Sequence, residues 1–422
     1  MRNGAGRMPA LREIICRSLA AAALLLWFSP LNVDASVSLG IDNFQAQGFP
    51  GLEGKRVGLV TNPSGVNAAG VSTIQVLERS GKVRLVALFG PEHGLYGTVK
   101  AGDAVANQRD PATGLPVYSL FGDTRKPTPQ MLQGLDVLVY DLQDIGVRSY
   151  TFISTLGLVM QAAAEQGIEV VILDRPNPLG GIRIEGGGVS PGHNSFVGQY
   201  DIPYVYGLTP GELAWWINER WLAKPCRLKI FKMSGWTRSM TWDRTGLKWV
   251  PTSPNIPRAD CAFGYVATGL LGDLGVTNGA NVSSYPFEVV ADQNLDPVAF
   301  TRRFNALGLP GVYGDPFSFY PTAGKFKTVQ FRGLRLAIDP QARTNLLSVN
   351  FQILDLLREL RPDKNYFAAA APDSIVLFDK INGGPGNRLA WTAGRNASDL
   401  MRTWQAREIQ WRVERQKFLL YP

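Results

Sequence analysis

The sequence predicts an α/β fold built on a parallel β-sheet, and three observations support this prediction. Short apolar runs alternate with stretches of helical spacing through the first half of the chain, as they do in βαβ units. The runs are almost continuously apolar, which is typical of strands buried on both faces of a sheet. Each run ends in a loop rich in polar residues, Gly and Pro, where open parallel sheets bind their ligands.

The individual elements of the first half follow from these patterns. Each predicted strand is rich in β-branched and apolar residues and stops at a turn cluster such as N-P-S-G or G-P-E-H-G. Strands are predicted at residues 55–61, 83–89, 135–140 and 169–173, and helices at residues 71–79 and 151–166.

A further helix is predicted in the segment T-P-G-E-L-A-W-W-I-N, which begins at Thr209. Thr209 fits the N-cap, Pro210 the first helical position and Glu212 the third residue of a capping box. This structural role is the favoured interpretation of Glu212, and a role in substrate binding stays open.

The second half of the chain is less regular. A Pro-rich loop spans residues 249–256, and amphipathic helices are predicted at residues 348–360 and 397–419. A length of 422 residues suits more than one domain. We place the boundary near residue 235, which gives a first domain over residues 36–235 and a second over residues 236–422.

The N-terminus, residues 1–35, is typical of a secretory signal peptide. Four arginines precede an apolar stretch of about ten residues, and V-D-A at residues 33–35 is a small-residue cleavage site. The stretch is too short to span a bilayer comfortably, and an uncleaved anchor is the alternative. We expect a secreted or periplasmic protein with no stable membrane insertion after cleavage.

Composition and motifs argue against several classes of function. The net charge is +8, but the basic residues form neither a stripe nor a recognisable module, so nucleic acid is not an expected partner. No G-x-G-x-x-G fingerprint or P-loop follows the first predicted strand. No G-x-S-x-G elbow stands at a predicted strand-to-helix turn. A dehydrogenase, a kinase and a serine hydrolase are therefore poor fits.

The sequence indicates no metal or organic cofactor. Only two histidines are present, His93 and His193, and no cluster of Cys or His has the spacing of metal ligands. Cys226 and Cys261 remain after the leader, and whether they form a disulfide stays open.

Polar side chains follow the predicted strands at the point where each strand ends. Because the carboxyl ends of parallel strands meet at one edge of a sheet, we expect these side chains to converge on one site. They are Asn62, Glu92, His93, Asp141, Asp144, Arg148, Asp174 and Asn177.

Glu92 is the candidate proton donor. It lies between Pro91 and His93, directly after an apolar strand, where we expect its apolar neighbours to desolvate it in part. Desolvation raises the pKa of a carboxylic acid, as a general acid near neutral pH requires. Glycoside cleavage needs such an acid to protonate the departing oxygen. His93 either orients Glu92, binds a sugar hydroxyl or has a purely structural role.

The neighbouring strand ends offer further candidates. Asp141 or Asp144 could supply a second carboxylate that activates water or stabilises an oxocarbenium ion, although Asp also hydrogen-bonds loop amides. Arg148 could pair with Asp144 or bind a substrate carboxylate as a planar fork. A similar polar cluster follows the fourth strand, formed by Asp174, Arg175 and Asn177.

Five motifs, taken in order, resemble those of a known family. They are G-L-V-T-N-P-S-G, L-F-G-P-E-H-G-L-Y-G, D-L-Q-D-I-G-V-R-S-Y-T-F, I-L-D-R-P-N-P-L-G-G and G-L-T-P-G-E-L-A-W-W-I-N. With the closing R-Q-K-F-L-L-Y, they are similar to the exo-β-N-acetylmuramidase family, glycoside hydrolase family 171, formerly a domain of unknown function. The resemblance covers nearly the whole chain after the leader.

The resemblance implies a Rossmann-like first domain, a smaller α/β second domain and a site in the cleft between them. It implies release of terminal, non-reducing N-acetylmuramic acid from peptidoglycan fragments or muropeptides, with Glu92 as the catalytic residue. The lactyl carboxylate of that sugar gives Arg148 or Arg175 a partner. We also count Tyr150 and Asn278 among the substrate-binding candidates.

The chain departs from the family pattern in two places. Many relatives carry E-G-T-N-x-S-x-G-R-G before P-F-E, whereas residues 271–288 read L-G-D-L-G-V-T-N-G-A-N-V-S-S-Y-P-F-E. Phe331 and Arg332 stand where relatives often have Cys before Gly. Two other hypotheses therefore stay open, which are a non-catalytic periplasmic binder of muropeptides and a hydrolase of another cell-wall sugar or bond, such as an amidase or a glucosaminidase.

Overall fold

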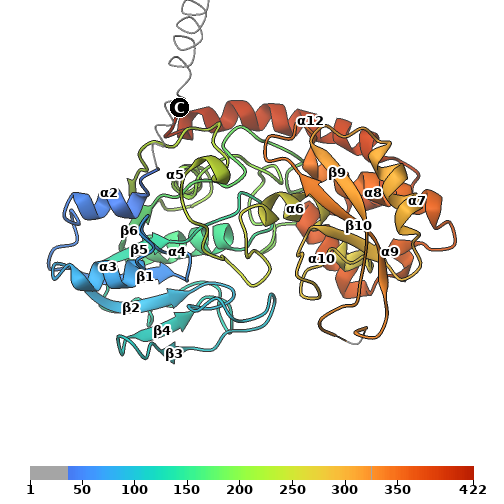
Figure 1. Ribbon diagram of the computed structural model, residues 1–422. Coiled ribbons are helices and arrows are strands. Elements are labelled where there is room, and N and C mark those ends of the chain that lie inside the picture. The colour runs from blue at the N-terminus through green and yellow to red at the C-terminus, as the bar shows by residue number, and fades with distance from the viewer. Residues whose placement is uncertain (1–36, 325) are drawn as a thin grey trace, which may run out of the picture. The chain divides into compact units, whose positions relative to one another are not determined.

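A seven-stranded sheet forms the centre of the N-terminal part of the protein (Figure 1). The computed structural model describes residues 37–324 and 326–422. The strands lie in the order β3-β4-β2-β1-β5-β6-β7. Their bounds are Arg56–Thr61 for β1, Arg84–Gly90 for β2, Gln108–Arg109 for β3, Pro116–Ser119 for β4, Val137–Asp141 for β5, Glu169–Leu173 for β6 and Arg227–Phe231 for β7.

The strand order places a switch point beside β1. All neighbouring strands are parallel except the β3–β4 pair, which is antiparallel. From β1 the chain first adds β2 on one side and later adds β5 and β6 on the other. In open α/β sheets the crevice beyond the carboxyl ends of such strands is where ligands bind. The loops that follow β2 and β5 are therefore the expected walls of a site.

Helices cover both faces of this sheet. Val170 and Ile172 of β6 belong to the hydrophobic cluster that includes α4 and α5, whereas Val171 and Leu173 belong to the cluster of α2 and α3. Side chains alternate along a strand, so a strand covered on both faces is apolar throughout. The helices are α2 (Gly40–Ala46), α3 (Thr73–Arg79), α4 (Phe152–Gln166) and α5 (Pro210–Arg220).

These elements confirm the fold class and the strands and helices predicted for the first half. The helix at Thr209 is also confirmed, with its capping box. The Thr209 hydroxyl accepts a hydrogen bond from the Glu212 amide at 3.2 Å, and the Glu212 carboxylate accepts one from the Thr209 amide at 3.0 Å. Glu212 is fully buried and forms an ion pair with Arg238, so its contacts are structural.

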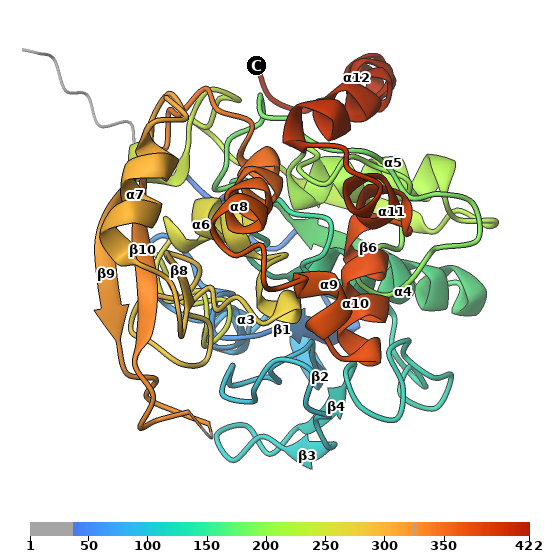
Figure 2. The same ribbon diagram turned by 90° about the vertical axis from the view of Figure 1, so that its right-hand side faces the viewer.

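The C-terminal part contains a second, smaller sheet that the sequence patterns did not predict. Its three strands are antiparallel in the order β8-β10-β9, and α7 packs against β9 and β10. Helix α8 packs against α6 and α12 (Figure 2). The strands are β8 (Val289–Asp292), β9 (Val312–Phe319) and β10 (Phe331–Ile338); the helices are α6 (Cys261–Thr268), α7 (Pro297–Asn305), α8 (Leu346–Leu360), α9 (Tyr366–Ala369), α10 (Pro372–Asn382), α11 (Gly386–Thr392) and α12 (Ala397–Glu414).

Three short 3₁₀ segments complete the described elements, namely η1 (Trp242–Arg244), η2 (Gly272–Leu274) and η3 (Arg415–Phe418). The helices predicted at residues 348–360 and 397–419 are confirmed as α8 and as α12 continued by η3. The predicted boundary near residue 235 falls in the interval between β7 and β8 and stays a prediction.

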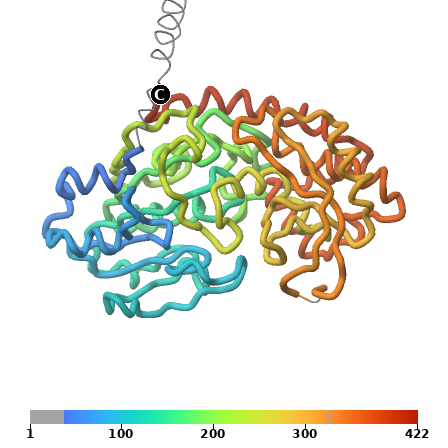
Figure 3. Tube along the Cα trace, viewed as in Figure 1, coloured from blue at the N-terminus to red at the C-terminus, as the bar shows by residue number. Residues whose placement is uncertain are grey.

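The end of the chain returns to the first sheet, as the red segment in Figure 3 shows. The Tyr421 hydroxyl donates a hydrogen bond to Asp174 at 2.5 Å, directly beyond β6. The Thr209 hydroxyl donates to the same carboxylate oxygen at 2.8 Å, and the Gly211 amide donates to the other at 2.8 Å. Asp174 therefore joins β6, the start of α5 and the C-terminal residues.

The structure bears on the expectations for the leader and the cysteines to different extents. The predicted signal peptide, residues 1–35, lies outside them. Cys226 and Cys261 are both described, and both are buried free thiols. Among the helices of residues 37–324 and 326–422, none is long and apolar enough to cross a lipid bilayer.

Replacing Thr209 with Ala should lower the free energy of unfolding by about 2 kcal/mol. The change removes an N-cap, which contributes about 1 kcal/mol, and one hydrogen bond to the buried Asp174, which contributes a similar amount. Urea denaturation measures the difference. Thr209→Ser keeps the hydroxyl, so its free energy of unfolding should be close to that of the unmodified protein. Equal losses of stability in the Ala and Ser variants would contradict this account.

Candidate active site

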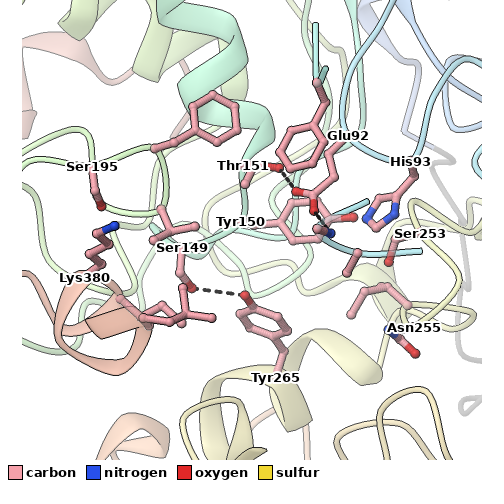
Figure 4. Close-up of a pocket in the computed structure, with 18 of the residues that line it drawn as sticks. Glu92, His93, Ser149, Tyr150, Thr151, Ser195, Ser253, Asn255, Tyr265 and Lys380 are labelled. Carbon is pink, nitrogen blue, oxygen red and sulfur yellow. Dashed lines mark hydrogen bonds between the residues drawn. The ribbon is translucent and has the colours of Figure 1, made fainter. Parts of the chain in front are cut away.

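A cavity of about 440 Å³ lies at the carboxyl ends of β2 and β5. Its walls come from the loops that follow β2, β4, β5 and β6, and from residues 253–256, α6, Phe287 and the end of α10 (Figure 4). Its polar and charged lining residues are Glu92, His93, Arg125, Ser149, Tyr150, Thr151, Ser195, Ser253, Asn255, Tyr265 and Lys380.

A tight turn after β2 presents Glu92 to the cavity. The Gly94 amide donates to the Pro91 carbonyl at 2.9 Å and closes the turn, and His93 adopts a φ of 72° within it. Non-glycine residues rarely take a positive φ, and those that do gather at functional sites. A Cβ on Gly90 would lie 2.7 Å from the Leu95 backbone nitrogen, so the turn also needs a glycine at that position.

Both carboxylate oxygens of Glu92 accept hydrogen bonds. The Thr151 hydroxyl donates to Oε2 at 2.6 Å, and the Gly102 amide donates to Oε1 at 2.8 Å (Figure 4). Only 9% of Glu92 is exposed. Thr151 is the N-cap residue of α4, yet its hydroxyl makes no capping bond because it points to Glu92 instead. These two bonds hold the carboxyl group in one position at the cavity wall.

His93 lies beside Glu92 and is held by its own loop (Figure 4). Its Nδ1 lies 2.8 Å from the Val99 carbonyl oxygen. Because a carbonyl oxygen can only accept, Nδ1 carries a hydrogen and the Nε2 atom of the neutral ring is an acceptor. His93 is therefore a fixed polar neighbour of Glu92 that can receive a hydroxyl hydrogen.

Two tyrosines contribute aromatic surface to the cavity. Tyr150 and Tyr265 meet edge to face with ring centroids 6.2 Å apart. The Tyr150 hydroxyl donates to Thr252 at 2.8 Å, and the Tyr265 hydroxyl lies 3.2 Å from that of Ser149. Burial raises the pKa of both tyrosines above the ordinary value, so both stay protonated and offer hydroxyls together with apolar ring faces.

Asp141 and Arg175, two of the predicted substrate-binding residues, bind each other instead of facing the cavity. The Arg175 guanidinium donates to both Asp141 oxygens, at 2.5 and 2.8 Å, and to the Val66 carbonyl at 2.7 Å. Asp141 also accepts a hydrogen bond from Thr73. Both side chains are at most 2% exposed, and neither lines the cavity. The pair joins the ends of β5 and β6.

Asp144, predicted as a second catalytic carboxylate, is also enclosed. It accepts hydrogen bonds from the Tyr206 hydroxyl and from the Gly146 amide, the latter at 2.6 Å. Burial raises the pKa of Asp144 to about 6. Asp144 does not line the cavity, so its surroundings do not place it beside Glu92 as a partner acid.

Arg148 binds backbone oxygens and has no carboxylate partner among the described residues. It donates to the carbonyls of Gly187 at 2.7 Å, Ile202 at 2.6 Å and Ile381 at 3.0 Å. Only 1% of the residue is exposed, and burial lowers the pKa of the guanidinium to about 10. Arg148 therefore ties α10 to two loops of the first sheet and is covered from the cavity.

The remaining candidates donate hydrogen bonds to backbone carbonyls of other segments of the chain. The Asn62 amide donates to the Thr252 carbonyl at 3.2 Å, and the Asn177 amide donates to the Leu208 carbonyl at 3.0 Å. Asn278 donates to the Thr268 carbonyl at 3.2 Å and lies in a separate cavity. Of the predicted site residues, the structure brings Glu92, His93 and Tyr150 together in one cavity, while Asp174 serves the junction described above.

Several lining residues were not predicted. Thr151 directly follows Tyr150 in the motif D-L-Q-D-I-G-V-R-S-Y-T-F, and Ser253 and Asn255 belong to the Pro-rich loop 249–256. The sequence patterns therefore identified the segments that contain these residues, but not the residues themselves. Tyr265 and Lys380 lie far in sequence from the strand-end loops that contain Glu92 and Tyr150, and no local pattern sets them apart.

Comparisons with known proteins support one family throughout the chain. The family model described as exo-β-N-acetylmuramidase NamZ, N-terminal, matches residues 57–260, and its C-terminal counterpart matches residues 263–421. The chain is 37% identical over 385 residues to the peptidoglycan β-N-acetylmuramidase NamZ of Bacillus subtilis (strain 168), with 91% of each chain covered.

Two solved structures from Bacteroides fragilis NCTC 9343, both DUF1343 family proteins, share the fold. One is 42% identical with a TM-score of 0.87, and the other is 24% identical with a TM-score of 0.70. Each comparison covers 92% of this chain and 99% of the other; the second supports the fold alone. On the motifs, the fold and these matches, the chain belongs to the exo-β-N-acetylmuramidase NamZ family of glycoside hydrolases.

Proposed function

We propose that this protein is a secreted exo-β-N-acetylmuramidase, which removes terminal non-reducing N-acetylmuramic acid from peptidoglycan fragments with Glu92 as general acid. The observation that carries the proposal is that Glu92 is the only acidic side chain among the described residues that line the cavity. The activity named for the Bacillus subtilis relative supports the choice of sugar. The charged, apolar and small-residue pattern of residues 1–35 supports secretion.

The contacts of Glu92 leave room for this chemistry. A carboxyl group has about four lone-pair positions, and Thr151 and Gly102 occupy two of them. One remaining position can carry the acidic hydrogen and face the glycosidic oxygen. The Thr151 hydroxyl hydrogen can rotate, so this contact persists whether Glu92 is protonated or ionised. Glu92 can therefore give up its hydrogen without moving.

A second catalytic carboxylate, common in glycosidases, is missing from the described lining of this cavity. We infer that the substrate's own acetamido group takes that role. Its carbonyl oxygen attacks C1 while the leaving oxygen takes the hydrogen of Glu92, which gives a cyclic oxazolinium. Water then attacks C1 and gives a hydrogen to the Glu92 carboxylate, which restores the acid. Two displacements retain the β configuration, which proton NMR of the first product detects.

Replacing Glu92 with Gln should lower kcat for release of N-acetylmuramic acid from a muramyl disaccharide by about 10²–10⁴-fold, the usual contribution of a general acid. Gln is similar in size but has no acidic hydrogen to give. Glu53→Gln, an exposed site in the turn before β1, is the matched control and should leave kcat unchanged. Product analysis by mass measures the release. Full activity in Glu92→Gln would reject the assignment, and saturable binding by the unmodified protein without any release would indicate a binding protein.

Replacing Thr151 with Val should lower kcat by about 10-fold with little change in KM, because Glu92 loses the hydroxyl that fixes its position. Thr151→Ser keeps the hydroxyl and should recover most of kcat. Steady-state kinetics on the same disaccharide separates the two constants. Equal kcat losses in the Val and Ser variants would contradict this account, because Ser keeps the hydroxyl that Val lacks.

A further inference from the structure

Two cationic side chains of the cavity have no acidic partner among the described residues. They are Arg125, which follows β4, and Lys380, which lies in the last turn of α10. Asp141 and Arg175, in contrast, bind each other at the ends of β5 and β6. An unpaired cation at the wall of a binding cavity leaves a position for a negative group of the ligand.

The backbone at Lys380 is fixed against the loop that contains Ser195. A Cβ on Gly198 would lie 2.8 Å from the Lys380 carbonyl oxygen and 3.5 Å from the Ser195 hydroxyl, so the loop and the end of α10 are in direct contact. The next residue, Ile381, accepts a hydrogen bond from Arg148 at 3.0 Å. Arg148 thus acts as a positioning residue that holds the end of α10 at the cavity wall.

Arg125 lies against the same loop. Its guanidinium carbon is 4.3 Å from the centre of the Phe196 ring and 5.2 Å from that of Phe121. Contacts of this kind hold a guanidinium over a ring while its edges stay free to donate. Arg125 and Lys380 therefore both border the loop of residues 195–198, and Figure 4 shows Lys380 and Ser195 at the opposite end of the cavity from Glu92 and His93.

The charges of the cavity favour an anionic ligand. Apart from Glu92, the acid of the proposed function, the charged side chains among the described lining residues are Arg125 and Lys380, and both are positive. The two arginines that the sequence offered for a carboxylate, Arg148 and Arg175, are buried in other contacts. The muramic sugar differs from its glucosamine counterpart by an ether-linked lactyl group, which ends in a carboxylate.

We propose that Lys380, together with Arg125, binds the lactyl carboxylate of N-acetylmuramic acid and so selects muramic over glucosamine sugars. This inference rests on the proposed function. It assigns the two ends of the cavity different tasks: Glu92 acts on the glycosidic bond, and the cations beside residues 195–198 recognise the sugar. Charge-assisted hydrogen bonds of this type are the stronger ones in proteins.

The experiment compares a chromogenic β-N-acetylmuramide with the same compound carrying a lactyl carboxamide. Lys380→Met should lower kcat/KM for the acid on the order of 10-fold, mainly through KM, and leave the carboxamide nearly unchanged. Arg125→Met should also lower the ratio of kcat/KM for the acid to kcat/KM for the carboxamide. Lys380→Arg keeps the positive charge and should keep most of this ratio. Lys224→Met, an exposed lysine before β7, is the matched control and should leave the ratio unchanged.

Equal losses on acid and carboxamide, or no loss in Lys380→Met, would overturn the inference. Calorimetry measures binding of free N-acetylmuramic acid and of its carboxamide without requiring turnover. It therefore tests recognition of the carboxylate separately from the proposed function. If the unmodified protein releases no sugar, the proposed function fails. Weaker binding of the acid to Lys380→Met than to the unmodified protein, with unchanged binding of the carboxamide, would still support the recognition of the carboxylate; unchanged binding of the acid would refute it.

Discussion

The hydrogen bond from the Thr151 hydroxyl to Glu92 is the contact on which the site depends. It joins the turn after β2 to the start of α4, which follows β5, and so spans the switch point of the sheet beside β1. The Gly102 amide donates a second hydrogen bond to the Glu92 carboxyl group and so helps to fix its position. A single acid can serve a cavity only if its position is fixed, because proton transfer requires hydrogen-bond geometry with the leaving oxygen. The parallel sheet supplies this by bringing two strand ends to one edge.

Behind that contact lies a layer of buried polar side chains that support the loops without touching the cavity. Asp141 and Arg175 join the ends of β5 and β6, and Arg148 connects the first sheet to α10 through the Ile381 carbonyl. Removing one partner of a buried ion pair costs about 3–5 kcal/mol, so loss of Asp141 or Arg175 alone would destabilise the loops that this layer supports. Its residues are polar and lie at strand ends, as binding residues do, but their partners are other parts of the chain.

This layer explains what the sequence could and could not predict. Continuous apolar strands showed a sheet buried on both faces, and the T-P-G-E segment identified the capping box of α5 because caps depend on near neighbours. The loop of Glu92 was also identified, since strand ends converge in this topology. Whether a strand-end arginine binds substrate or a carbonyl depends on distant residues such as Ile381, which no local pattern reveals. The antiparallel sheet β8-β10-β9 and the placement of Tyr265 and Lys380 depend on long-range packing for the same reason.

The central claim is that Glu92 gives a proton to the leaving group, and the dependence of Glu92→Ala on the leaving group tests it most directly. The measurement compares kcat/KM, which reports the steps up to departure of the leaving group, for a muramyl disaccharide and for a dinitrophenyl muramide whose phenolate departs without a proton. The account predicts a loss of about 10²–10⁴-fold for the disaccharide and a far smaller loss for the dinitrophenyl compound. Equal losses on the two substrates would contradict it.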